Sequence, residues 1–440
     1  MTSMRWRRRL AGILAGAAAL SFAAGARADS FPRVAVHPDG RAFFSFRHEV
    51  DRTAHVRERA RSVSGTYTAS RGISFGTGGW AYGGEIGVDA AGAATYAWDR
   101  GTSPDYVYGR RRAADGTLEP LQTLSPPHSG DVAVAVDRRG SAVFAWHHVV
   151  DYDPDHPVAV IQERRRSADG KLGPIRTLSP ADGLYLEPEV AVDADGNALV
   201  VWVRSDPDLE NAVVQARRIG ADGAVGALRT LSAPAPAAAG PQVAFDAKGN
   251  ALVAWTSVRD RHDVPELTRR TPTGAYSPVQ TLSTSPLGAD HLRLGVAPDG
   301  SATIVWTTFA NETGNVVRAC RRAADGTLGA VVRLSPDRSI YPDVAVDPGG
   351  GATVVWTHTQ SDANGLVQTR RRPAAGPFGS TQTVSAPEQG DVWDEPQVAV
   401  DGDGNAMFAW VQYPPWGDYT ILARRRTAAG LLGAIESVSG

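Results

Sequence analysis

One aromatic residue returns at almost regular intervals along this chain. It is Phe46 in the first instance and tryptophan in the next seven, and neighbouring members lie 48 to 56 residues apart: Trp98, Trp146, Trp202, Trp255, Trp306, Trp356 and Trp410. A period of this length is the signature of a repeat architecture, in which each unit buries its apolar surface against the next. The chain therefore reads as eight tandem repeats, at approximately 31–83, 84–130, 131–187, 188–240, 241–291, 292–341, 342–395 and 396–440.

Each repeat contains four short segments that are typical of β-strands. An apolar triplet such as residues 190–192 is followed by an Asp-x-x-Gly turn and an alternating run such as residues 198–202. After a variable loop, a third segment ends in arginines, as in residues 367–372, and a glycine turn leads to a fourth segment such as residues 381–385. Short strands joined by glycine turns form antiparallel hairpins. Each repeat is therefore expected to be one four-stranded sheet.

Two further positions recur in all eight repeats. A glycine follows each arginine run at a fixed distance: Gly65, Gly116, Gly170, Gly223, Gly274, Gly326, Gly376 and Gly430. The middle residue of each first strand is small: Ala35, Gly87, Ala135, Ala191, Ala244, Gly295, Ala345 and Ala399. Small side chains suit the crowded innermost strands of a closed ring, where every sheet is covered by its neighbours.

The fold class that these repeats predict is all-β, a single β-propeller of eight four-stranded blades. A seven-bladed ring with an altered entry segment is the alternative, because the first repeat has His37 in place of the recurring Asp and Phe46 in place of Trp. A β-solenoid is a weaker alternative, since its strands pair between coils and need no tight turns within a repeat. Eight blades are favoured because the first repeat retains all its segments.

The N-terminus resembles an export signal. Basic residues at Arg5 and 7–9 precede an apolar run at 10–24, and Ala26-Arg27-Ala28 supplies small residues for cleavage. Residues 1–28 are therefore expected to be a signal peptide cleaved near Ala28, with residues 29–440 secreted or periplasmic by the general or the twin-arginine route. The apolar run is too short for an ordinary membrane span and no later segment is long enough, so the chain is not expected to span a membrane.

Charge and cysteine content exclude several classes of partner and site. The chain has 45 basic and 47 acidic side chains and a formal charge of -2, which argues against binding to nucleic acid. Cys320 is the only cysteine, so an intramolecular disulfide and a cysteine-based zinc site are excluded. We expect a monomer with no cofactor, no metal ion and no catalytic residues that the sequence identifies.

The turns before the fourth segments resemble part of a known motif. Ala113-Ala114-Asp115-Gly116-Thr117 and Ser167-Ala168-Asp169-Gly170 occupy the place of the Asp-box in sialidase-type propellers. The chain is thus similar to secreted bacterial β-propeller repeat proteins and, loosely, to sialidase-type propellers. It lacks the full Asp-box spacing and the Phe-Arg-Ile-Pro motif of sialidases, so the resemblance implies a fold but no activity.

The connections within and between blades divide into two faces. The short glycine and Asp-x-x-Gly turns fall on one face, and the longer connections, between second and third strands and between blades, fall on the other. We call the second the variable-loop face. Diversified loops on a rigid scaffold are where binding sites usually lie.

Acidic and aromatic residues gather in the variable loops of the third and eighth repeats and in the loop that precedes the eighth repeat. Rings that stack on sugars beside carboxylates that accept hydroxyl hydrogen bonds suit carbohydrate recognition, although local packing is the simpler account of the same residues. The candidate ligand-binding residues are Asp151, Asp153, Asp155, His156, Asp391, Trp393, Asp394, Tyr413, Trp416 and Tyr419.

These observations predict an exported, non-catalytic binding module whose variable-loop face engages a carbohydrate, a cell-envelope component or a protein. The first alternative is a glycoside hydrolase or sialidase-like hydrolase with its acids on the same face, about 5 to 9.5 Å apart. The second is a purely structural surface protein. The arginine runs, such as residues 110–112, are expected to pair with aspartates that end the first strands, such as Asp89.

Overall fold

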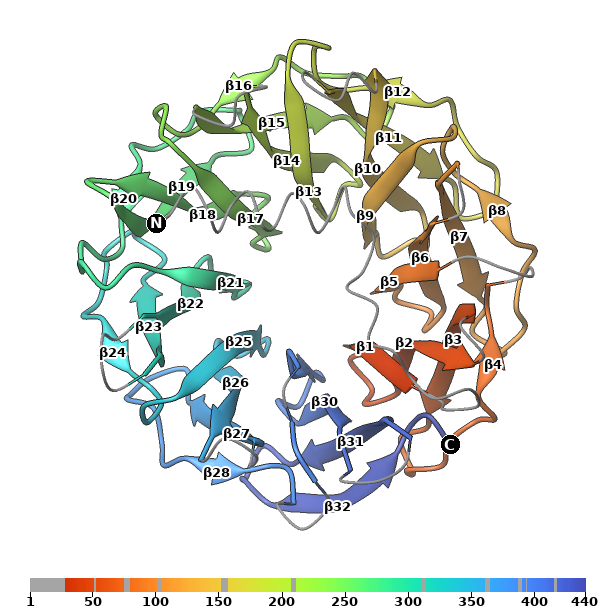
Figure 1. Ribbon diagram of the computed structural model, residues 1–440, viewed down its shortest axis with the longest axis vertical. Helices are drawn as coiled ribbons and strands as arrows, with labels where there is room; N and C mark the ends of the chain where they lie inside the picture. Colours follow the sequence, from red (N-terminus) through yellow and green to blue (C-terminus); the bar gives the residue numbers. More distant parts are fainter. Residues whose placement is uncertain are drawn as a thin grey trace.

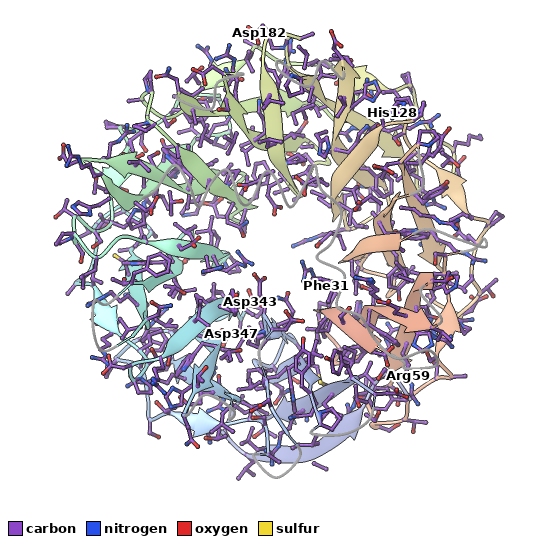
Figure 2. All side chains as sticks on the ribbon, viewed as in Figure 1. Phe31, Arg59, His128, Asp182, Asp343 and Asp347 are labelled. Atoms are coloured by element: carbon purple, nitrogen blue, oxygen red, sulfur yellow. The ribbon has the colours of Figure 1, made fainter. Side chains whose placement is uncertain are left out.

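The chain forms a ring of eight antiparallel four-stranded sheets, as the computed structural model in Figure 1 shows, and Figure 2 shows that the drawn side chains leave a central opening. The structure describes residues 28–50, 53–74, 80–101, 104–151, 157–206, 211–309, 314–360, 365–386, 390–392, 394–414 and 418–440. The prediction of an eight-bladed β-propeller is confirmed, and the divergent first repeat is a complete blade. Nowhere in these ranges does a helix occur with the length and apolar character that crossing a membrane requires.

Each blade is built from four consecutive strands, with the innermost strand first. Blades 1 and 2 contain β1 (Ala28–Val36), β2 (Ala42–Val50), β3 (Thr53–Arg61), β4 (Arg71–Gly72), β5 (Trp80–Val88), β6 (Ala94–Gly101), β7 (Tyr106–Arg112) and β8 (Gln122–Thr123). Blades 3 and 4 contain β9 (Ser129–Val136), β10 (Ala142–Asp151), β11 (Val158–Arg166), β12 (Arg176–Thr177), β13 (Leu184–Val192), β14 (Ala198–Ser205), β15 (Ala212–Ile219) and β16 (Arg229–Thr230).

The second half of the ring repeats this order. Blades 5 and 6 contain β17 (Ala238–Phe245), β18 (Ala251–Arg259), β19 (His262–Arg270), β20 (Gln280–Thr281), β21 (Asp290–Val296), β22 (Ala302–Thr308), β23 (Val316–Arg322) and β24 (Val332–Arg333). Blades 7 and 8 contain β25 (Ser339–Val346), β26 (Ala352–Thr359), β27 (Gly365–Arg372), β28 (Gln382–Thr383), β29 (Gln397–Val400), β30 (Ala406–Gln412), β31 (Thr420–Arg426) and β32 (Leu432–Ser437). The outermost strands of the first seven blades have only two residues each, so little sheet edge is left unpaired.

The core lies between the blades. The eight recurring aromatic residues are each at most 1% exposed. Trp202, for example, packs with Val200 of its own blade and with Ala133 and Val143 of blade 3. The recurring small residues line the tightest contacts, since a Cβ added at Gly87 would lie 2.3 Å from Cγ2 of Val136 on the next blade. This repeated inter-blade packing holds the ring rigid around its axis.

Among the described residues the ring closes without exchanging a strand, because blade 1 contains only β1 to β4 and blade 8 only β29 to β32. Side chains and backbone hydrogen bonds, such as that from the amide of Gly402 to the carbonyl of Pro38 at 3.0 Å, join these two blades instead. Nε of Arg61 contacts Glu436 at 2.8 Å, and the Tyr67 hydroxyl donates to the same carboxylate at 2.8 Å. Nη1 of Arg59 donates to the carbonyl of Val438 at 3.0 Å. Packing and polar contacts therefore hold the first and last blades together.

In blades 2, 7 and 8 the aspartate that ends the inner strand pairs with the middle arginine of the same blade, as the sequence predicts. Arg111 contacts Asp89 at 2.8 Å, and Arg371 contacts Asp347 at the same distance. Cys320 is buried and unpaired, in agreement with the exclusion of a disulfide.

Candidate ligand-binding site

A ring of mostly polar side chains borders the central opening. Its members lie two residues before the small residue of each inner strand: Arg33, Glu85, Ala133, Glu189, Gln242, Arg293, Asp343 and Gln397. We call this set the inner ring. Seven of the eight are charged or carry an amide, and none of those seven is fully buried. Figure 2 shows Phe31 and Asp343 beside the opening.

A bulge in the inner strands directs these side chains. Pairing with the second strand is interrupted just before the inner-ring residue, for example between Leu186 and Glu189 and between Ile340 and Asp343. The backbone φ is positive within the interruption, at 51° for Glu187 and 58° for Tyr341. A bulge bends a strand and re-aims its side chains, which explains how charged residues of an otherwise packed strand reach the opening.

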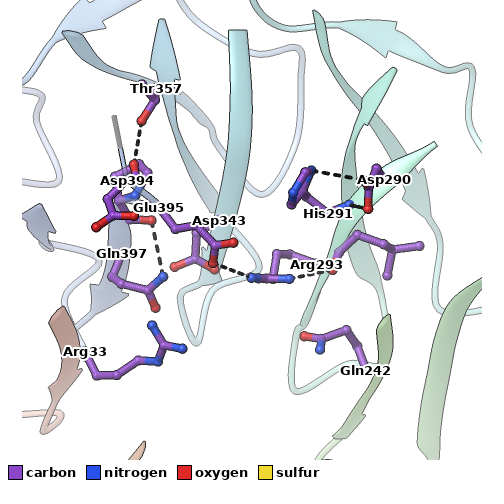
Figure 3. A network of polar contacts seen from close by, with 12 residues as sticks. Arg33, Gln242, Asp290, His291, Arg293, Asp343, Thr357, Asp394, Glu395 and Gln397 are labelled. Atoms are coloured by element: carbon purple, nitrogen blue, oxygen red, sulfur yellow. Dashed lines mark hydrogen bonds and ion pairs between the residues drawn. The ribbon is translucent and has the colours of Figure 1, made fainter. Parts of the chain in front are cut away.

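Two arginines make the main ion pairs at the opening. Nε of Arg33 lies 2.8 Å from Oε1 of Glu85 in the next blade. Nη2 of Arg293 lies 3.0 Å from Oε2 of Glu395, which precedes β29 in blade 8. Figure 3 shows Arg33, Arg293, Asp343 and Glu395 gathered in one region, where Arg293 reaches across from blade 6. Arginines and carboxylates of three or more blades thus meet at the opening.

Backbone amides of the following blade hold several of the carboxylates. Oδ2 of Asp131 accepts from the amide of Glu187 at 3.0 Å, and Oε2 of Glu187 accepts from the amide of Gly240 at 2.6 Å. Oδ2 of Asp343 accepts from the amide of Val398 at 2.8 Å. These bonds fix the carboxylates in position, so the opening is lined by preoriented acceptors.

The environment shifts the protonation of the acids at the opening. Burial within the ring raises the pKa of Glu189 to about 8, and the nearby Glu85 carboxylate adds to this effect. Burial also raises the pKa of Asp343, against the lowering influence of Arg293. The Glu85 carboxylate is the main cause that raises the pKa of Arg33, which stays charged. At neutral pH the opening therefore offers the Glu189 carboxyl as a hydrogen-bond donor beside charged groups.

Three of the residues predicted from sequence meet beside this opening, in blade 8. The Tyr413 hydroxyl donates to Oδ2 of Asp394 at 2.9 Å, and the rings of Tyr413 and Tyr419 pack edge to face with centroids 4.4 Å apart. Burial raises the pKa of Asp394, against the lowering influence of the Tyr413 hydrogen bond; the charge of Glu395 adds to the rise and that of Arg33 opposes it. We call Asp394, Tyr413 and Tyr419 the blade 8 cluster, and it adjoins the charged residues of the opening.

The other predicted residues have different places. Asp391 supports the backbone, since its Oδ1 accepts from the amide of Gly365 at 2.9 Å and its own backbone pairs with that of Tyr413. Asp151 ends β10 in blade 3, and blades 1 and 2 separate it from blade 8. The remaining candidates lie outside the described residues: Asp153, Asp155, His156, Trp393 and Trp416.

The inner ring was not predicted from the sequence, whose acidic and aromatic residues pointed to the variable loops. A signal was present, because a charged or amide residue stands two positions before the small residue in seven of eight repeats. Polar residues that recur in an inner strand need water or partners, so they mark a surface facing the axis.

A second group of titratable residues lies between blades 2 and 3. Burial raises the pKa of Asp99 to about 8 and lowers that of His147 to about 4, and an added Cβ at Gly130 would touch both side chains. Within the described ranges, no three His, Cys, Asp or Glu side chains are grouped so that they could hold a metal ion.

Comparison with known proteins supports the fold. No family model and no curated protein matches this sequence. The chain is similar to a solved ulvan lyase of a polysaccharide lyase family, with a TM-score of 0.50 and 8% identity over 80% of this chain and 90% of that one. It is also similar to the Hadza microbial sialidase Hz136, with 14% identity, a TM-score of 0.40, and 71% and 70% of the two chains covered. An α-L-arabinanase of Penicillium chrysogenum has 14% identity and a TM-score of 0.41, over 68% of this chain and 94% of that one. The eight-bladed β-propeller fold rests on the eight four-stranded sheets of the ring.

Proposed function

We propose that this protein is an exported, non-catalytic propeller that binds a carbohydrate at the variable-loop end of its central opening. One observation carries the proposal: paired arginines and preoriented carboxylates of several blades lie beside the Tyr413–Tyr419 pair. Carboxylates and guanidinium groups bind sugar hydroxyls, and tyrosine rings pack on the apolar faces of sugars. A protein or another cell-envelope component is the alternative partner at the same place.

A glycan and cell-wall binding screen of the purified protein tests this proposal. Arg293→Gln removes the charge that reaches Glu395, and Tyr419→Ala removes one ring of the blade 8 cluster. Each is expected to weaken saturable binding about tenfold, in line with the loss of one good contact. Tyr106→Ala, which removes a half-buried tyrosine from β7 of blade 2, serves as the matched control and should bind normally. Equal binding by all three variants would refute the placement of the site.

A hydrolase is the second candidate, favoured by the acids at the opening. A Glu189 carboxyl that keeps its proton at neutral pH has the property of a general acid, and ionised carboxylates lie in the same ring. Release of reducing ends from a panel of polysaccharides tests this function. Activity that Glu189→Gln abolishes would replace the binding proposal, whereas the absence of released sugar beside saturable binding would support it.

Export is part of the proposal. We propose that residues 1–28 direct the chain to the periplasm or the medium and are then removed. Cell fractionation with N-terminal sequencing of the exported protein tests this, and an intact N-terminus in the cytoplasm would contradict it.

A further inference from the structure

The first arginine of the arginine run links adjacent blades at six of the eight junctions. Its Nε donates to a carbonyl of its own blade at 2.6 to 2.8 Å, and its Nη1 donates to a carbonyl of the preceding blade at 2.7 to 3.4 Å. We call these residues the clamp arginines: Arg59, Arg110, Arg164, Arg217, Arg370 and Arg424. Each guanidinium therefore fills the outer groove between two blades.

The groove between blades 4 and 5 is open because Thr268 stands in the clamp position. The Thr268 hydroxyl still donates to the carbonyl of Ser277 at 2.8 Å, as a clamp arginine does within its own blade. It is too short to reach the preceding blade as well. A cavity of about 370 Å³ remains there, lined by Thr268, Ser277, Tyr276, Leu231 and Arg229 among others.

The junction of blades 8 and 1 shows what the polar groups of such a groove bind. There Glu436 accepts from Nε and Nη2 of Arg61 at 2.8 and 2.9 Å and from the Tyr67 hydroxyl at 2.8 Å. In blade 5 the same two donors recur as Arg270 and Tyr276, whose backbones form the same bridge as those of Arg61 and Tyr67.

The acceptor does not recur. In the sheet that contains Glu436, this residue pairs with Ala423. The equivalent pair in blade 4 is Ala216 with Arg229, so Arg229 stands at the position of Glu436. An arginine thus occupies the place of the carboxylate, beside two other donors.

Arg229 also lacks the partner that similar arginines have. Arg71 and Arg176 hold the same position in blades 1 and 3, and their guanidinium groups contact Glu58 and Glu163. Blade 4 has Ala216 in place of these glutamates, and no carboxylate pairs with Arg229 in the described part of the chain. Blade 6 also lacks a clamp arginine, since Cys320 stands at that position. It differs from blade 5 because its Arg322 has an acceptor, the side chain of Gln280, at 2.9 Å. The excess of positive charge is therefore particular to the groove between blades 4 and 5.

We propose that this groove binds a sugar acid, a single uronic-acid unit in size. Its carboxylate takes the place that the Glu436 carboxylate of blade 8 has beside Arg61 and Tyr67, with Arg229, Arg270 and the Tyr276 hydroxyl as donors. Charge-assisted bonds from arginine to a carboxylate are among the stronger hydrogen bonds, and this site supplies two guanidinium groups.

The rest of the cavity fits the body of such a ligand. The sugar ring takes the space that a clamp arginine fills elsewhere, between Leu231 and the Thr268 and Ser277 side chains. Its hydroxyls donate to the carbonyl of Leu231, whose counterpart Leu178 accepts from Arg217 at 2.7 Å in the preceding junction. This site lies on the outer part of the ring and is independent of the central opening.

Ligand-observed NMR of the full chain with D-glucuronate tests the proposal, with D-glucose as the neutral probe of the same size. We expect glucuronate to bind and glucose to bind at least about tenfold more weakly, because it lacks the carboxylate. Two variants restore features of other blades and so should fold. Thr268→Arg refills the groove with a clamp arginine, and Arg229→Glu places an acid at the position that Glu436 has in blade 8. Both are expected to abolish glucuronate binding.

Arg139→Glu is the matched control, because it makes the same change of charge at an exposed turn of blade 3 and should leave binding unchanged. Three results would overturn the proposal: no saturable binding of glucuronate, equal binding of glucose, or binding that survives Thr268→Arg and Arg229→Glu. Binding that Arg293→Gln removes while these two variants keep it would also overturn it, since the ligand would then sit in the central opening.

Discussion

Replacing Gly87 by alanine should destabilise the ring, although alanine is the residue at this position in six of the eight blades. An added Cβ would lie 2.3 Å from Cγ2, 2.9 Å from Cβ and 3.3 Å from the backbone nitrogen of Val136. Val136 is β-branched and lies in a paired strand, so it has little freedom to rotate away. Relieving this clash requires β5 and β9 to move apart.

Overpacking of this kind costs about 1 to 3 kcal/mol. Replacing glycine by alanine returns about 0.5 to 1 kcal/mol through the lower entropy of the unfolded chain. The net loss for Gly87→Ala is therefore about 1 to 2 kcal/mol, measured as a lower midpoint of urea unfolding with unchanged slope. Ala135→Gly, the reverse change in the next blade, is the control and should cost about 0.5 to 1 kcal/mol without a clash. A Gly87→Ala protein as stable as the parent or more so would refute the steric argument.

Three other substitutions test further contacts of the structure. Trp202→Ala should lower the free energy of unfolding by about 3 to 5 kcal/mol, because it empties a fully buried site between blades 3 and 4; a loss below 1 kcal/mol in chemical denaturation would contradict this. Glu436→Gln should cost about 1 to 3 kcal/mol by weakening the contact of Arg61 and Tyr67 across the closure, and an unchanged melting temperature would count against that role. Glu189 keeps its proton to about pH 8 in the folded protein but loses it near pH 4 in the unfolded chain. Its contribution to the free energy of unfolding therefore declines as the pH rises between these values, by at most about 1.4 kcal/mol per pH unit. The stability of Glu189→Gln relative to the parent should therefore increase from pH 5 to pH 8. A difference in the free energy of unfolding that does not depend on pH would show that the pKa of Glu189 is not raised.

The repeat made the architecture predictable because every blade solves the same packing problem. Trp202 and its counterparts must be buried, and the small residues such as Ala191 must lie where inner strands crowd together, whatever the loops contain. Pairing of Asp89 with Arg111 was likewise foreseeable, since both residues recur at the ends of strands that lie in one sheet.

The candidate site was only partly predictable. Asp394, Tyr413 and Tyr419 come together as a cluster, but Asp391 is used to hold the backbone of Gly365. The sequence does not say which carboxylate satisfies an amide and which faces a ligand, because that depends on the direction in which each loop returns.

The sequence by itself determined the class of fold and the residues that fill the spaces between the blades, and it favoured eight blades over seven, because local strand and turn signals repeat eight times. Tertiary structure alone decided how side chains of different blades meet. Arg293 reaches Glu395 although 102 residues separate them. Likewise, Arg229 lacks the carboxylate that its counterparts have, and it lies beside Tyr276 of the next blade. Such encounters depend on closure of the ring, which places residues by their angle around the axis and not by their distance along the chain.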